Sequence, residues 1–167
     1  MACDISSGRT LKCKTVGGVK NIYFINYISN FRDDISVAGT LFNITSISPT
    51  PTAYKFELRG SQGMNTTNEA SRDNGTNFYT STGTFKIGNV DTSADNLLYT
   101  LSNGNPQMIV EDYNGGVWLY GMENGCDVSV NRNLGASMGD GTNYEVTVTT
   151  IERQPPYDAE LNQFTII

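Results

Sequence analysis

Acidic side chains are the residues of this sequence with the clearest potential for chemistry, because the chain contains no histidine. Without histidine the commonest general base is missing, as are nucleophile pairs of the Ser-His or Cys-His kind. The adjacent carboxylates Asp33-Asp34 and Glu111-Asp112 would point to opposite faces of a strand, so neither pair converges on one reacting atom. We therefore predict that the protein is not an enzyme. A glycosidase site built from acids distant in the sequence stays open as an alternative.

Cofactor and metal motifs are missing as well. The sequence has no Walker glycine-lysine loop and no GxGxxG motif opening a helix. The segment DTSADN (91–96) resembles a calcium loop, but Asn96 replaces the expected glycine and Ser102 the expected glutamate, so we interpret it as a helix cap. The cysteines are Cys3, Cys13 and Cys126. Since they form no CxxC pair, we predict free, mostly buried thiols, no metal site and no cofactor.

The composition favours an all-β protein with many turns. Hydrophobic residues make up 38% of the 167 residues and charged residues only 17%, and glycine is frequent. The net charge is −6, from 11 basic and 17 acidic residues, and no stretch concentrates Lys or Arg. A protein that grips nucleic-acid phosphates is therefore disfavoured. We see no signal peptide, and no apolar run approaches the ~20 residues of a membrane span.

Strand patterns recur along the whole chain. The most regular is 53–60, in which Tyr54, Phe56 and Leu58 alternate with charged residues. The other expected strands cover 19–28, 34–47 with a bulge or bend at Gly39, 76–90 with an interruption at Gly83, 126–133 and 143–153. In the last of these, Tyr144, Val146, Val148 and Thr150 are expected to share one face. Together they predict one domain, 1–167, built as a β-sandwich or barrel of antiparallel strands with one flanking α-helix.

That helix is expected at 92–103. Asp91, Thr92 or Ser93 can cap its N-terminus, and Gly104 stands where a C′ glycine ends a helix. The apolar residues at i, i+3, i+4 and i+7 form one stripe that predicts the buried face: Ala94, Leu97, Leu98 and Leu101.

A hairpin is expected over 107–122. Asn114-Gly115 supplies the two positive-φ positions of a tight turn, and the following strand is apolar on both faces. A solvated hairpin should have one polar face, so something must cover this one. We predict that a neighbouring subunit does so, and we name the following interface residues, with three from other segments: Val117, Trp118, Leu119, Tyr120, Met64, Phe164 and Ile166.

Three further segments have the character of contact surfaces. Residues 1–17 form an irregular N-terminal arm, and 154–167 form a proline-broken C-terminal tail. The polar segment 60–76 is either a long loop or a pair of strands that projects from the body. Apolar surface and strand edges of this extent invite partner strands, so we predict self-assembly.

Four blocks of the sequence resemble structural proteins of tailed bacteriophages, most closely tail tube (major tail) proteins. They are MACDISSGRTLKCKTVGGVKNIYFINY, AYKFELRG followed by SRDNGTNFYTSTGTFKI, IVEDYNGGVWLYGMENGCDVSV, and GASMGDGTNYEVTVTTIERQPPY. Their order and spacing cover most of the chain, and none is a catalytic signature.

The resemblance implies a fold and a location. Tail tube subunits are similar to β-sandwiches with one flanking helix, and they assemble into hexameric rings that stack into a hollow tube. The implied location is the virion tail, after assembly in the cytoplasm of the host bacterium. The helix at 92–103 would lie on the outer side of the sandwich.

The resemblance also implies contacts. Sheets of neighbouring copies would join edge to edge, the segment 60–76 would touch the next ring, and the N-terminal arm and C-terminal tail would make further contacts. Other virion proteins would bind the ends of the tube. Viral DNA would pass through an acidic bore without specific binding, because walls of like charge repel it. We name Glu57 and Glu145 as candidate acids of the bore.

Two alternatives remain at this point. The protein could be another phage component, either a capsid decoration protein or a head–tail connector. It could also be a carbohydrate-binding β-sandwich module, with Trp118 and the surrounding tyrosines as a stacking platform.

Overall fold

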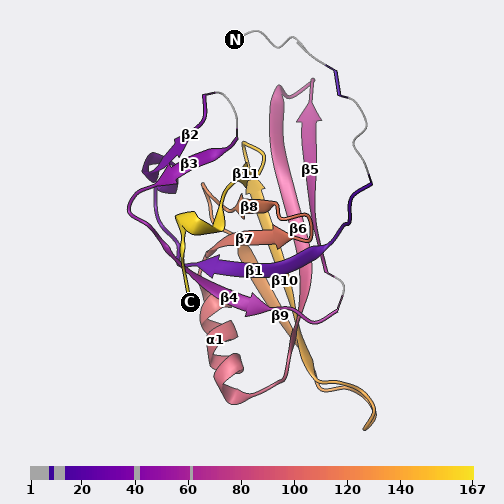
Figure 1. The fold of residues 1–167 in the computed structure, drawn as a ribbon. Helices are drawn as coiled ribbons and strands as arrows, with labels where there is room; N and C mark the ends of the chain where they lie inside the picture. The colour runs from indigo at the N-terminus through magenta and orange to yellow at the C-terminus, as the bar shows by residue number, and fades with distance from the viewer. Residues whose placement is uncertain (1–7, 10–13, 40–41, 61) are drawn as a thin grey trace.

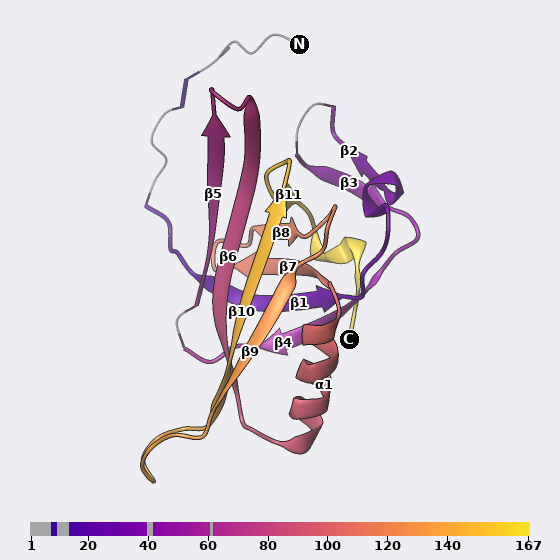
Figure 2. The same cartoon turned by 180° about the vertical axis from the view of Figure 1, so that it is seen from behind.

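The protein is a β-sandwich with one flanking helix. The structure is a computed structural model that describes residues 8–9, 14–39, 42–60 and 62–167. Its larger sheet has the strand order β11-β8-β7-β1-β4-β12 and the smaller has β5-β6-β10-β9. The strands of the two sheets cross steeply (Figures 1 and 2).

The six-stranded sheet is antiparallel except at one edge, where β12 pairs in parallel with β4. Its strands come from the whole length of the chain: β1 (Val19–Ile25), β4 (Thr52–Glu57), β7 (Gln107–Asp112), β8 (Val117–Tyr120), β11 (Tyr157–Asp158) and β12 (Thr165–Ile166). A small hairpin, β2 (Ile35–Val37) with β3 (Ile44–Ile47), and the 3₁₀ turns η1 (Phe31–Asp34) and η2 (Leu161–Gln163) lie outside it.

The four-stranded sheet is antiparallel throughout. It consists of β5 (Gly63–Ser71), β6 (Thr76–Gly88), β9 (Asp127–Asn133) and β10 (Asn143–Glu152). The β5–β6 hairpin rises past the six-stranded sheet at one end of the molecule, and the β9–β10 loop extends from the opposite end (Figure 1). The segment 60–76 is thus mostly a projecting strand pair, one of the two forms the sequence allowed.

Two hydrophobic cores lie on the two faces of the six-stranded sheet. The first fills the space between the sheets, where Phe24 and Phe56 make an edge-to-face contact at 5.2 Å and Val146 and Val148 of β10 face them. The predicted common face of β10 is confirmed, because Tyr144, Val146, Val148 and Thr150 are all buried.

The second core covers the opposite face of the same sheet. Its sheet residues include Tyr23, Ile109 and Leu119, and its cover comes from the β2–β3 hairpin, η1 and the segment from Tyr157 to Phe164. Because both faces are buried, the six-stranded sheet needs apolar residues at consecutive positions.

Helix α1 (Thr92–Asn103) has the predicted bounds. The Asp91 carboxylate accepts a hydrogen bond from the Ala94 N–H at 2.7 Å, which confirms a capping role. Leu98 is buried against the inter-sheet core, whereas Leu97 is 53% exposed, so the stripe is only partly a core face. Gly104 ends the helix in extended conformation, not in the left-handed one expected of a C′ glycine. No helix in the described part of the chain is long and apolar enough to span a membrane.

Two turn predictions need correction. Residues 34–47 form a hairpin and not one bent strand, because Gly39 has φ +60° between β2 and β3. In the β7–β8 hairpin only Gly115 has a positive φ, so the turn is not the tight two-residue type. Its geometry comes from Asp112, whose carboxylate accepts from the N–H groups of Asn114 and Gly116 at 2.8 Å each.

Gly83 does not interrupt β6, which pairs with β10 without a break through that position. A side chain there would collide with the core, since a Cβ would lie 2.5 Å from the Met64 sulfur and 2.7 Å from the Phe85 ring. The glycine is therefore a packing requirement of the four-stranded sheet.

Candidate functional site

Strand β8 holds four of the predicted interface residues, and three of them are buried inside the chain itself. Val117 and Leu119 belong to the second core, and Tyr120 to the first. Their exposed fractions are 6%, 0% and 7%. The prediction that these three side chains contact a neighbouring subunit is wrong. The β2–β3 hairpin and the C-terminal segment of the same chain cover Val117 and Leu119, and Tyr120 is buried between the two sheets.

Trp118 is the exception on this strand, with 37% of its surface exposed. Its indole N–H donates to the Asp112 carboxylate at 3.3 Å. Since that carboxylate already accepts two backbone hydrogen bonds, Asp112 is an organiser of the turn. Trp118 remains available to a partner through the exposed part of its ring.

The other three predicted interface residues have different surroundings. Phe164 is 6% exposed and belongs to the second core, so its assignment to an interface is also corrected. Ile166 is 41% exposed on the edge strand β12. Met64 is half-buried on β5 and packs against the first core. The C-terminal tail as a whole is used within the subunit, where β11 pairs with β8 and β12 with β4.

The two candidate bore acids lie on different sheets. Glu57 is on β4, exposed, and 3.5 Å from the Lys55 amine. Glu145 is on β10, in register with Lys86 of β6, and its strand neighbours of the same parity are Asn143, Thr147 and Thr149. It therefore belongs to the outer, polar face of the four-stranded sheet. The structure does not bring these two acids together.

Among the strands that the structure describes, neither edge strand of the four-stranded sheet has a strand partner on its outer side, and helix α1 packs beside one of them, β9, where Arg132 pairs with Asp95 at 3.2 Å. Strand β5 has nine residues and β9 has seven, and each is paired on one side only. Within the described residues, no backbone hydrogen bond joins the free side of either strand to another segment. Neither strand carries a proline or a lysine; the charged residues on them are Glu69 of β5 and Asp127 and Arg132 of β9.

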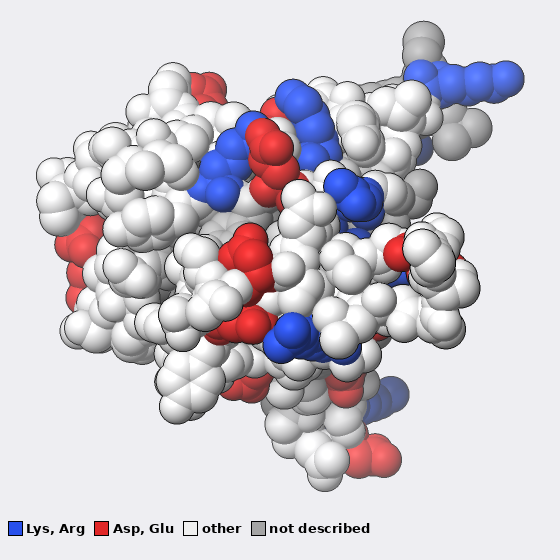
Figure 3. Space-filling view, turned by 90° about the horizontal axis from the view of Figure 1, so that it is seen from below, with Lys and Arg blue, Asp and Glu red and all other residues white. Residues whose placement is uncertain are grey.

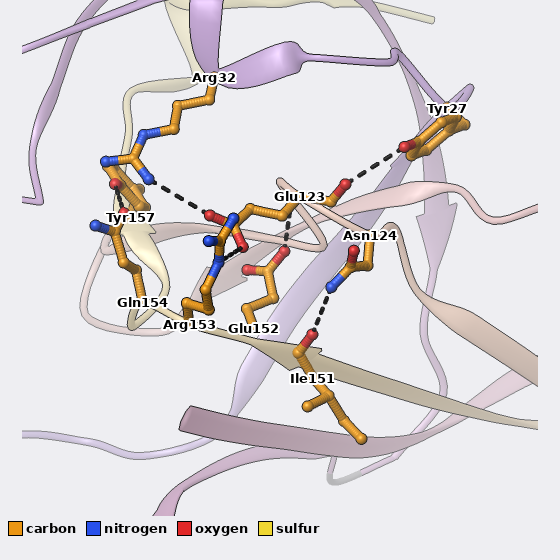
Figure 4. Close-up of polar contacts among 9 residues, drawn as sticks. All are labelled: Tyr27, Arg32, Glu123, Asn124, Ile151, Glu152, Arg153, Gln154 and Tyr157. Carbon is orange, nitrogen blue, oxygen red and sulfur yellow. Dashed lines mark hydrogen bonds and ion pairs between the residues drawn. The ribbon is translucent and has the colours of Figure 1, made fainter. Parts of the chain in front are cut away.

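A polar cluster centred on Glu123 ties the two sheets together at the β8–β9 turn (Figure 4). The Glu123 carboxylate accepts from Arg153 at 3.1 Å and from Arg32 at 3.4 Å. Its backbone N–H donates to the Glu152 carboxylate at 2.8 Å. Asn124 donates to the Ile151 carbonyl at 3.1 Å, and Tyr157 hydrogen-bonds Gln154. The cluster connects η1, the turn and the end of β10.

Two buried carboxylates, Glu152 and Glu111, have pKa values shifted in opposite directions. Glu152 is 8% exposed and forms no ion pair with any residue that the structure describes, and burial raises its pKa. Burial also acts to raise the pKa of Glu111, but hydrogen bonds from Asn21, Lys20 and Tyr23 outweigh it and leave the pKa below its usual value. Burial and Glu111 together raise the pKa of Tyr23 to about 12.

The described residues contain no group of three or more side chains able to hold a metal ion. Cys126 is a free, fully buried thiol between the sheets, and burial raises its pKa far above the usual range, which disfavours a reactive thiolate. Cys3 and Cys13 lie outside the described residues. The absence of enzymatic activity stays a prediction.

Charge is dispersed over the lower end of the molecule. Figure 3 shows basic and acidic side chains interspersed there, with broad uncharged areas between them. The face in view has no continuous basic patch of the kind that holds a phosphate backbone.

Comparisons of the chain with protein-family models, with curated protein sequences and with solved structures gave no match. Sequence reasoning missed the Glu123 cluster, because its members are scattered between positions 27 and 157 and follow no local pattern.

Proposed function

We propose that this protein is a self-assembling structural subunit, and specifically a tail tube protein of a tailed bacteriophage. The observation that carries the proposal is the pair of open edges on one sheet, the nine residues of β5 and the seven of β9. An edge of one copy can pair with the opposite edge of the next, which is a head-to-tail contact. Such contacts generate closed rings when the rotation between copies closes.

The rest of the molecule is compatible with a ring. The buried face of the four-stranded sheet carries the second sheet and the helix, so its polar outer face is the one available to line a narrow bore. Glu145 lies on that face, whereas Glu57 lies on the other sheet. We therefore retain Glu145 as a candidate bore acid and give less weight to Glu57. The hairpins at opposite ends of this sheet would lie at the ends of a ring.

The test is to block one edge. We expect Asn65→Lys/Thr67→Lys, two exposed positions of β5, to abolish assembly, because lysine on an edge strand opposes strand addition. The matched control is Ser93→Lys/Asn96→Lys, which adds the same charge at exposed positions of α1. Electron microscopy and sedimentation velocity of the three proteins provide the measurement, and circular dichroism checks that each is folded.

The outcomes separate the candidates. Stacked rings or tubes from the unmodified protein and the control, with none from the β5 variant, support the proposal. Isolated rings, or trimers or monomers that bind capsids, indicate a connector or decoration protein. A monomer at high concentration with reproducible hits on a glycan array favours a carbohydrate-binding module, for which the exposed ring of Trp118 is the relevant feature.

A further inference from the structure

Four asparagines of this chain are each followed directly by glycine, and the four pairs have very different surroundings. The pairs are Asn74-Gly75, Asn103-Gly104, Asn114-Gly115 and Asn124-Gly125. Asparagine is a thermolabile residue. When glycine follows it, the glycine backbone nitrogen can attack the side-chain carbonyl carbon, because glycine has no side chain to hinder the approach. The attack still requires that both groups are free to meet.

Two of the pairs have their amide side chains held by the backbone. The Asn114 amide donates to the Val16 carbonyl, and its oxygen accepts from the Val16 N–H at 3.2 Å. The Gly115 N–H, which would be the attacking group, donates to the carbonyl of the last residue of β7, also at 3.2 Å. Asn103 is the last residue of α1, and its amide donates to the Tyr99 carbonyl at 2.7 Å. Reaction at either pair would first require these hydrogen bonds to break.

A third pair is fixed in the turn between β8 and β9. The Asn124 amide donates to the Ile151 carbonyl at 3.1 Å, and the Gly125 N–H donates to the Gly121 carbonyl at 3.0 Å. Gly125 is buried, and an atom added at its Cβ position would collide with the Asn105 carbonyl. Because there is no room for a new ring at this glycine, the pair can react only after the turn has opened locally.

The fourth pair, Asn74-Gly75, lies at the tip of the projecting β5–β6 hairpin (Figure 1). Both residues are exposed. Among the described residues, neither the Asn74 side chain nor the Gly75 N–H has a hydrogen-bond partner, and the bond at this pair joins the Asn74 N–H to the Ser71 hydroxyl at 3.3 Å. Gly75 has φ +63°, and no atom of a non-adjacent described residue lies within 4 Å of the position that its Cβ would occupy. Both reacting groups are therefore free and surrounded by open space.

We propose that Asn74 is a self-modification site, at which the chain converts this asparagine to aspartate or isoaspartate without an enzyme. The Gly75 nitrogen forms a bond to the Asn74 side-chain carbonyl carbon and gives up its proton. The carbon–nitrogen bond of the side-chain amide breaks, and the amide nitrogen leaves with that proton as ammonia. Water then opens the resulting succinimide ring at either carbonyl group. One opening gives aspartate, and the other gives isoaspartate, in which the main chain passes through the side-chain carbon.

Either product changes the charge of the hairpin tip. The turn 72–75 carries one basic and one acidic residue, Arg72 and Asp73, and is therefore neutral before the reaction. A new carboxylate at position 74 makes the tip negative. Isoaspartate also lengthens the main chain of the turn by a methylene group. The modification requires a free hairpin tip and no assembly of copies.

The test is to incubate the folded, full-length protein in mildly alkaline buffer and to follow the four asparagines by peptide mapping with mass spectrometry. The Asn65→Lys/Thr67→Lys protein is used, because it is expected not to assemble and its hairpin tip therefore stays free. We expect Asn74 to lose its amide while the other three asparagines keep theirs. The matched control is the same protein unfolded in guanidinium chloride, in which all four pairs have lost their hydrogen bonds and should react at similar rates.

Asn74→Gln is the chemical control in the folded state, because the longer side chain would have to close a larger ring. Anion-exchange chromatography should show a more acidic species that grows with time in the parent protein and is missing in Asn74→Gln. The inference is overturned if folded Asn74 keeps its amide after the unfolded chain has lost it, or if another of the four reacts as fast in the folded protein. An acidic species that forms equally in Asn74→Gln would also contradict it. None of these results depends on whether copies assemble, so the proposed function can stand or fall separately.

Discussion

The two sheets differ in how much of their surface the chain itself covers. The six-stranded sheet is covered on both faces by its own chain and ends in the two-residue strands β11 and β12. The four-stranded sheet buries one face, presents a polar second face and leaves long edges open. An apolar sequence therefore marks the self-contained sheet here, and the polar, Thr- and Asn-rich sheet is the better candidate for contact with other copies.

The largest effect should come from the self-contained sheet. Leu119→Ala removes a side chain with 0% exposure and should lower the free energy of unfolding by about 2–5 kcal/mol. Trp118→Ala, one position away, should cost only about 1–2 kcal/mol, because the ring is 37% exposed. Urea denaturation measures both. If Trp118→Ala lowered the free energy of unfolding by more than Leu119→Ala, Trp118 and not Leu119 would be the more deeply buried residue of β8, contrary to the structure.

The four-stranded sheet can be probed through its tightest position. Gly83→Ala should destabilise the protein by about 1–3 kcal/mol, because the added methyl group meets the Met64 sulfur and the Phe85 ring. Met64→Ala should recover part of that loss by making room, so the double variant should be less destabilised than the sum of the single changes. Strict additivity in thermal or urea unfolding would contradict the close packing.

The smallest effect concerns pH and contrasts one carboxylate from each sheet. Glu152 has a raised pKa, so the folded state holds its proton more tightly, and its contribution to stability is lost as the pH rises through that pKa. Glu111 has a lowered pKa, so its contribution is present above the ordinary pKa of about 4.3 and is lost as the pH falls.

Unfolding free energies at pH 4.5 and pH 7 compare the two glutamine variants with the parent. The free energy of unfolding of Glu152→Gln, relative to that of the parent, should be more favourable at pH 7 than at pH 4.5, because the variant removes a buried charge that is present at the higher pH. Glu111→Gln should lower the free energy of unfolding by more at pH 7 than at pH 4.5, because the stabilising charge of Glu111 is more fully present at pH 7. Parallel changes in the two variants would show that their surroundings do not differ as described.

The sequence predicted what is decided locally. Helix α1 has its expected bounds because Asp91 caps it and the apolar spacing is regular, and β10 has its expected face because its residues alternate. It could not predict which segment covers a given face. The cover of β8 comes from Tyr157, Ala159 and Phe164, tens of residues further along the chain, and periodicity gives no information about such distant contacts.

The same limit explains the misassigned interface. A strand that is apolar on both faces has the same pattern whether a neighbouring molecule or a distant part of its own chain covers it. Leu97 shows the converse, because a regular helical stripe placed it with the core although it borders an exposed groove. Polar edge strands such as β5 give no apolar signal at all.

The closure of the second core late in the chain has a consequence for biosynthesis. The Gln163 amide donates to the Ile44 carbonyl across a separation of 119 positions, and β12 adds to β4 only at residues 165 and 166. A nascent polypeptide on the ribosome therefore leaves this apolar face exposed to water until residues 157–166 have emerged. The subunit can therefore complete its fold only after these residues have been synthesised. A stalled or truncated product would expose the second core and should bind chaperones.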